Sequence, residues 1–147
     1  MEDHLFDIEK AQKLLPDLER WLQTAIHARK LICEIESEYT ALVKRIFLMG
    51  GKIVDVSHFA ERRKEKETSE AVFQDAMQSI HECGCVVKDL EVGLIDFPCR
   101  MGDKEVYLCW KLGEPTIRYW HSMEDGFSGR KLIDEKFVAK AKRSPFV

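Results

Sequence analysis

A seam of apolar residues near the start of the chain constrains its fold more than any other feature. Successive members are alternately three and four residues apart, which is the period of a coiled-coil helix. They are Ala11, Leu14, Leu18, Trp21, Ala25, Ala28, Ile32, Ile35, Tyr39, Leu42 and Ile46. The seam predicts one helix of about 40 residues, which would be about 60 Å long at 1.5 Å per residue.

The ends of this first helix are also marked in the sequence. Asp7 can cap a helix that begins at Ile8, because its carboxylate can accept a hydrogen bond from a free N–H of the first turn. Gly50-Gly51 predicts its end. Pro16 predicts a kink or a restart, because proline has no N–H to donate.

A second helix follows, with a polar middle that bears on assembly. Asp55 or Ser57 can cap it, and it should reach Cys83 and stop at Gly84. Its middle, residues 61–70, reads ERRKEKETSE and has almost no apolar side chain. In an antiparallel hairpin this stretch would leave the seam near Ile35 half buried. We therefore expect a homodimer in which the seam also packs on a second chain.

After Gly84 the apolar period changes from helical to alternating, which indicates strands. A short strand should turn at Glu91-Val92-Gly93 into an extended piece that ends at Pro98. A turn at Gly102-Asp103 leads to a strand over 106–112, which should pair with 116–122 across Gly113-Glu114-Pro115.

These patterns together predict an α+β fold. We expect a long antiparallel, coiled-coil-like helical hairpin with a small antiparallel sheet of three or four strands packed at one end. The corresponding domains are residues 1–84, residues 85–132 and a basic C-terminal tail over 133–147. From Gly129 onward the chain has six basic and two acidic residues, but it lacks the interleaved aromatics of nucleic-acid-binding segments.

Charge and cysteine content narrow the functional classes. The formal net charge of −3 gives no general attraction to nucleic acid or to an anionic membrane, and we expect neither as a partner. No apolar run has the roughly 18 residues needed to cross a bilayer, and the acidic N-terminus does not resemble a signal peptide. The five cysteines form no evident disulfide framework, which favours a reducing cytoplasmic location.

The hairpin over residues 107–121, YLCWKLGEPTIRYWH, carries the main candidate site. If Leu112 lies opposite Thr116, Cys109 and His121 become diagonal neighbours on one face of the sheet, and Asp96 can approach them. Imidazole, thiolate and carboxylate suit zinc or iron, and imidazole could instead activate the thiol as a nucleophile. The alternative is a packed hairpin core without a site.

Three weaker sites remain open. His81, Cys83, Cys85 and Cys99 offer four soft ligands for zinc, but without close C-x-x-C spacing. Asp89 and Asp96 could be a general acid and base, although Asp beside Gly or Pro more often forms a turn. The polar and aromatic residues of the sheet could bind a partner: Trp110, Glu114, Arg118, Trp120 and Arg130.

Four segments in the same order resemble an uncharacterised bacterial and archaeal family catalogued as domain of unknown function 2203. They read VKDLEVGLIDFP, YLCWKLGE, YWH and GFSGR, and the early FDIEKAQKLLP is similar to the family's opening except that Asp7 stands where Thr or Ser is usual. The resemblance covers roughly Leu5 to Leu132. It implies a helical hairpin with a small sheet and no established activity. The matching positions are Lys88, Asp89, Gly93, Asp96, Cys109, Trp110, Glu114, Trp120, His121 and Arg130.

Two functional hypotheses follow from the sequence. The favoured one is a dimeric interaction or scaffold protein that assembles through its helices and binds an unknown protein through the aromatic sheet face. The alternative is a small metal- or thiol-dependent enzyme centred on Cys109 and His121.

Overall fold

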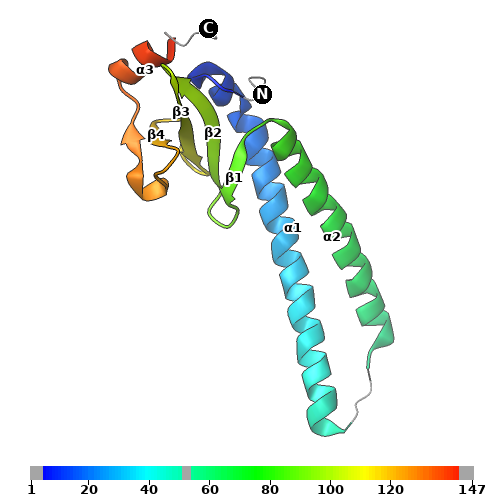
Figure 1. The fold of residues 1–147 in the computed structure, drawn as a ribbon. Coiled ribbons are helices and arrows are strands. Elements are labelled where there is room, and N and C mark those ends of the chain that lie inside the picture. The colour runs from blue at the N-terminus through cyan, green and yellow to red at the C-terminus, as the bar shows by residue number, and fades with distance from the viewer. Residues whose placement is uncertain (1–4, 51–53, 143–147) are drawn as a thin grey trace. The chain divides into compact units, whose positions relative to one another are not determined.

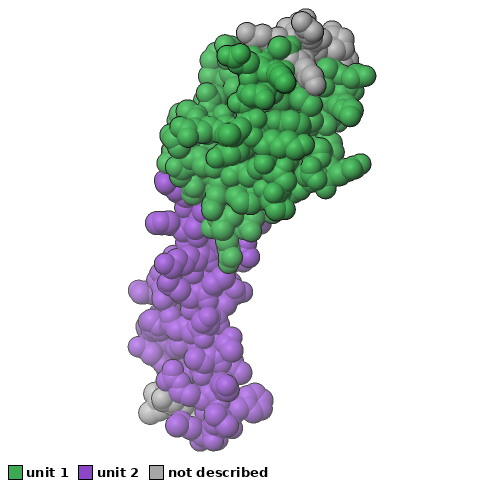
Figure 2. Space-filling view, turned by 90° about the vertical axis from the view of Figure 1, so that its left-hand side faces the viewer, with its two compact units in different colours: residues 1–22, 78–147 green, residues 23–77 purple. Residues whose placement is uncertain are grey.

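The computed structural model describes residues 5–50 and 54–142, and it divides into two compact units (Figure 2). One unit contains residues 1–22 and 78–147, and the other contains residues 23–77. We call them the sheet unit and the helical unit. The boundaries of these units differ from those of the predicted domains at 1–84, 85–132 and 133–147, and that domain division stays a prediction. The last part of the predicted tail, residues 143–147, lies outside the described residues. The acidic N-terminus at 1–4 and Gly51 lie outside them as well.

Helix α1, Ile8–Met49, is the long helix that the seam predicts. Asp7 caps it as expected, because the backbone N–H of Lys10 donates to Asp7 Oδ1 at 2.7 Å. Pro16 lies inside the helix and does not interrupt it, so the predicted restart is wrong. The helix is followed by Gly50 in a left-handed conformation at φ 68°.

In the helical unit, α1 runs antiparallel to α2, Val56–Glu82 (Figure 1). Asp55 rather than Ser57 caps α2, since the N–H of His58 donates to Asp55 Oδ1 at 3.0 Å. The polar middle of α2 faces α1 through ion pairs, one of which joins Arg62 Nη2 to Glu38 Oε2 at 2.9 Å. Ile35 is fully buried, so the prediction that this position is half buried is wrong.

Among the described residues, the sheet unit holds five antiparallel strands in sequence order, whereas three or four were expected. Figure 1 shows how they lie side by side. The strands are β1 Val86–Asp89, β2 Leu94–Met101, β3 Lys104–Lys111, β4 Tyr119–Ser122 and β5 Lys131–Leu132. A 3-10 turn, Phe127–Gly129, precedes β5, and helix α3, Glu135–Lys142, follows it. The additional strand has only two residues, too few to give a recognisable alternation in the sequence.

Strand β2 continues through Pro98 to Met101, although the sequence predicted an end at Pro98. The carbonyl of Pro98 accepts a hydrogen bond at 2.7 Å from the N–H of Phe6, which forms an isolated bridge on that side of the strand. The backbone nitrogen and carbonyl of one strand residue point the same way, so the missing N–H of Pro98 faces away from β3. The ladder between β2 and β3 therefore loses no hydrogen bond, which is how a strand tolerates proline.

One face of the sheet forms the core of this unit. Alternate residues of β2 and β3 point into it and are buried: Ile95, Phe97, Cys99, Val106, Leu108 and Trp110. The ring of Phe6 packs edge-on against Phe97 with the centroids 5.2 Å apart. On the same side, Trp110 lines a cavity of about 370 Å³ together with Leu15 and Pro16 of α1. None of the described helices is both long and apolar enough to cross a membrane.

Candidate metal site

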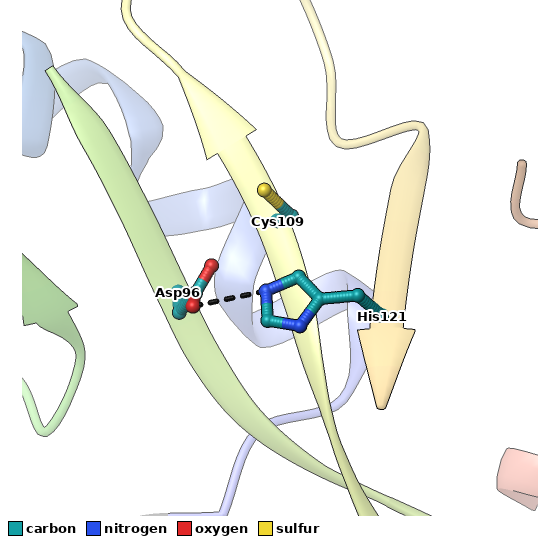
Figure 3. Close-up of side chains that lie close together, drawn as sticks. All are labelled: Asp96, Cys109 and His121. Atoms are coloured by element: carbon teal, nitrogen blue, oxygen red, sulfur yellow. Dashed lines mark hydrogen bonds and ion pairs between the residues drawn. The ribbon is translucent and has the colours of Figure 1, made fainter. Parts of the chain in front are cut away.

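Three residues on the other face of the sheet form a buried polar cluster (Figure 3). Asp96 lies on β2 directly opposite Cys109 on β3, and His121 lies on β4. Their candidate ligand atoms all lie within 4.8 Å of one another, and each side chain is at most 3% exposed. We call these three residues the ligand cluster.

The hairpin register that brings Cys109 and His121 onto one face is the predicted one. Tyr107 lies opposite His121, and Cys109 lies opposite Tyr119. Gly113 in the connecting loop has φ 104°, a conformation that glycine adopts without strain. The predicted pairing does not extend to Leu112 and Thr116, since β4 begins only at Tyr119.

The ring of His121 is held by both of its nitrogens. Nδ1 lies 2.8 Å from the backbone carbonyl oxygen of Ser122, and Nε2 lies 3.0 Å from Asp96 Oδ2. The carbonyl can only accept, so Nδ1 carries a proton. Nε2 therefore shares one proton with Asp96, as imidazolium and carboxylate or as neutral imidazole and carboxylic acid. In either form the pair has no net charge.

Asp96 has an unused acceptor inside the sheet unit. Its Oδ1 atom is buried and has no hydrogen-bond partner among the described residues. A buried polar atom without a partner costs free energy, and native proteins seldom leave one without a reason. A bound cation would satisfy this oxygen.

The Cys109 thiol is protonated at neutral pH. Burial raises its pKa to about 12, with the negative charge of Asp96 as the next cause and Arg130 acting in the opposite direction. The two ring nitrogens of His121 already face Ser122 and Asp96, so neither is placed as the general base that a cysteine nucleophile needs. The geometry does not support a nucleophilic thiol.

The same three side chains suit a soft or borderline divalent metal. Zinc binds thiolate, imidazole and carboxylate, and three protein ligands with an open fourth position are typical of catalytic zinc. Ligating histidines usually donate their second N–H to a carbonyl or carboxylate, which fixes the ring orientation. His121 makes that bond through Nδ1 to Ser122 and turns Nε2 toward Asp96.

A salt bridge beside the cluster links two residues that the sequence could not connect. Arg130 Nη2 donates to Glu114 Oε1 at 2.7 Å and to Oε2 at 2.9 Å. The guanidinium carbon lies 3.9 Å from the centroid of the Tyr119 ring and 4.5 Å from that of Phe127. Both charges were assigned to a partner-binding surface, but they bind each other. Their separation of 16 residues leaves no periodic signal.

The other proposed binding residues differ in exposure and in contacts. Trp110 is buried, and its indole N–H donates to the backbone oxygen of Glu114 at 2.9 Å. Trp120 is half buried and packs against Phe137 of α3, while Arg118 is exposed and bonds Thr116. A joint partner-binding role for these residues stays a prediction.

Neither of the other two candidate sites gains support. Among the described residues, Asp96, Cys109 and His121 are the group of potential metal ligands that lie close together. The four residues proposed as a zinc site are not part of it: His81, Cys83, Cys85 and Cys99. Burial raises the pKa of Cys85 to about 12 and that of Cys99 to about 11.

The two aspartates have different roles. Asp89 forms the expected turn, because its Oδ1 accepts from the N–H of Glu91 at 3.0 Å. Asp96 lies inside a strand, so interpreting it as a turn residue was wrong. The turn instead needs Gly93, which has φ 72° and lies so close to Leu112 that a Cβ would meet its side chain at 2.5 Å.

Comparisons with known proteins give a family but no activity. The model of a family described as an uncharacterised conserved protein, domain of unknown function 2203, matches residues 4–133. Searches of curated proteins and of solved structures found no match.

Proposed function

We propose that this chain, which belongs to the family called domain of unknown function 2203, is a metal-binding protein that holds one divalent ion, zinc or iron, with Asp96, Cys109 and His121. The carrying observation is the ligand cluster, in which three buried metal-binding side chains come from three neighbouring strands.

Two details support a metal over a purely structural polar pair. The first is the buried Oδ1 of Asp96 without a hydrogen-bond partner. The second is the Nδ1–H of His121 on a backbone carbonyl, the arrangement that orients a metal-ligating imidazole. Binding would replace the Cys109 thiol proton and the proton shared by Asp96 and His121. An ion there would connect strands β2, β3 and β4.

Metal analysis of the purified protein without a polyhistidine tag tests the proposal. We expect near one zinc or iron per chain. Cys109→Ser and His121→Ala should each lose most of the metal, because each removes one of three ligands. Cys99→Ser is a matched control, since Cys99 is equally buried but lies outside the ligand cluster.

Cobalt provides a second readout in metal-stripped protein, because a thiolate bound to Co²⁺ gives an ultraviolet charge-transfer band. The parent and Cys99→Ser should show the band, and Cys109→Ser should not. A folded parent that takes up neither zinc, iron nor cobalt would disprove the proposal.

Assembly into a homodimer is a second candidate function, and the helical unit supplies the supporting observation. Large apolar side chains lie exposed at the C-terminal end of α1, including Phe47 at 84% and Leu48 at 78%. Solvent-exposed apolar groups of this kind often mark contacts with another chain. We place the proposed contact at this end of the hairpin rather than at Ile35, which is already buried within the chain.

Light scattering at micromolar concentration tests this candidate. The parent should have twice the mass of one 17.1 kDa chain. Phe47→Ser with Leu48→Ser should shift the protein toward the monomer. Val92→Ser is a control at an exposed apolar residue of the sheet unit. A monomeric parent would rule out the dimer.

A further inference from the structure

The segment over residues 123–133, which we call the closing segment, returns the chain to the sheet after β4 and contains the 3-10 turn and β5. Residues 123–128 are all exposed, and both residues of β5 are exposed as well. Segments with so few buried contacts open at low free-energy cost. Its attachment therefore depends on a small number of contacts.

Arg130 provides the most extensive of these contacts. Besides the two hydrogen bonds to Glu114, its Nη2 lies 3.4 Å from the backbone oxygen of Cys109. The guanidinium also contacts the rings of Tyr119 and Phe127. Because Tyr119 lies opposite Cys109, Arg130 lies on the face of the sheet that holds the ligand cluster.

Glu114 is fixed from the other side. Its Oε1 accepts the backbone N–H of Lys111 at 2.8 Å, so the carboxylate is anchored to the end of β3. The salt bridge thus joins the closing segment to the hairpin that carries Cys109. The side chains are only 12% and 24% exposed for Arg130 and Glu114, which limits competition from water.

We infer that Glu114 and Arg130 form a latch that holds the closing segment over the ligand cluster and controls the access of ions and small reagents to it. That a divalent metal ion is the species that reaches the ligand cluster rests on the proposed function. The latch itself concerns only the opening of the segment, and it can be measured without metal.

Pulsed labelling of metal-stripped, full-length protein with N-ethylmaleimide tests the latch, with mass spectrometry resolving each cysteine. Glu114→Gln removes the charge that holds Arg130 and keeps an amide oxygen for the N–H of Lys111. We expect Cys109 to be labelled about tenfold faster or more in this variant. Arg130→Lys keeps the charge but not the planar group that contacts both rings, and it should also speed labelling.

Cys85 and Cys99 are internal controls, because both are buried in the same unit outside the cluster. Their labelling rates should not change in Glu114→Gln. Glu124→Gln is the matched variant, since it removes an exposed carboxylate from the closing segment without touching the salt bridge. It should label like the parent.

Two results would overturn the latch. One is an unchanged Cys109 rate in both Glu114→Gln and Arg130→Lys. The other is an equal acceleration at Cys85, Cys99 and Cys109, which indicates general unfolding.

A metal arm separates this inference from the proposed function. In zinc-loaded protein, Glu114→Gln should release zinc to a chelator about tenfold faster while still binding one ion per chain. A parent without metal disproves the proposed function only, because thiol labelling still reads the latch. If the parent binds metal but the parent and Glu114→Gln release zinc at the same rate, only the latch is disproved.

Discussion

The helical unit and the sheet unit each pair a carboxylate with a basic side chain that is distant in sequence, but in opposite surroundings. Glu38 and Arg62 join two helices, and their side chains are 32% and 23% exposed. Asp96 and His121 join two strands at 1% and 3%. The helical pair keeps its charges in contact with solvent. Burial has removed water from the sheet pair, and other interactions must offset the free-energy cost of this desolvation.

This difference indicates which pair carries function. A partly exposed ion pair follows from covering a helix with charged residues, and no special role is needed to explain it. A buried pair beside an unpartnered Oδ1 and a thiol is a poor way to stabilise a sheet. This contrast supports placing the proposed metal-binding function in the sheet unit.

The largest expected effect concerns the apolar face that supports the cluster. Trp110→Ala should lower the free energy of unfolding by about 3–5 kcal/mol, because the removed ring is 1% exposed. Trp120→Ala should cost less, since Trp120 is only half buried. Both rings lie on the apolar face, because Trp120 pairs with Leu108 and Trp110 follows Leu108 by two residues. Urea unfolding gives both values, and equal losses would show that this face is packed as tightly at β4 as at β3.

The next effect tests the cost of the buried pair in metal-free protein. Asp96→Ala leaves the Nε2 of His121 without a partner and should cost about 1–3 kcal/mol. Replacing both residues by leucine should return stability to near the parent value or above it. If the double variant is much less stable than Asp96→Ala, the pair is stabilising and the comparison fails.

Alkaline pH should destabilise the protein through its buried thiols. In the folded state the pKa values of Cys85 and Cys99 are raised from 9.0 to about 12 and about 11. Between pH 9 and the raised pKa of each thiol, the unfolded chain binds fewer protons than the folded chain. The free energy of unfolding therefore falls as pH rises in this range. Each thiol contributes at most about 1.4 kcal/mol per pH unit above roughly pH 9.

Urea midpoints between pH 8 and pH 11, in metal-free protein, measure this slope. Cys85→Ala should make the slope shallower, and Cys33→Ser should leave it unchanged because Cys33 is exposed. A midpoint that does not move with pH in this range would contradict the prediction.

The smallest effect belongs to the helical pair. Arg62→Gln should leave the urea midpoint almost unchanged at physiological salt, because water can replace the lost partner of Glu38. Its counterpart in the sheet unit, Arg130→Gln, should be clearly more destabilising. If the order is reversed, the exposed network holds the helices together more strongly than this comparison allows.

The sequence predicted those features that depend on short-range patterns. The seam and Asp7 located α1, and the alternation on either side of Gly113-Glu114-Pro115 suggested the hairpin register that brings Cys109 to His121. Apart from Pro16, which lies within α1 without restarting it, the misses involve interactions between distant parts of the chain. Ile35 is buried although the middle of α2 is polar. Pro98 is tolerated because its missing N–H faces away from β3, on the side where Phe6 donates to its carbonyl.

The ligand cluster was only partly predictable for the same reason. Cys109 and His121 followed from the hairpin, and Asp96 was recognised as able to approach them. Its position inside a strand depends on the exact pairing of β2 with β3. The salt bridge between Glu114 and Arg130 joins two loops. Loop residues have no periodic pattern in the sequence from which such a pairing could be predicted.

The strand order has a consequence for how the site is assembled as the chain folds. Since the five strands pair in sequence order, all three ligands lie within two adjoining hairpins between Leu94 and Ser122. Such local pairings close small loops and form early relative to long-range contacts. A nascent chain could therefore complete the triad as soon as β4 pairs with β3. The closing segment, synthesised afterwards, would then cover an ion already in place.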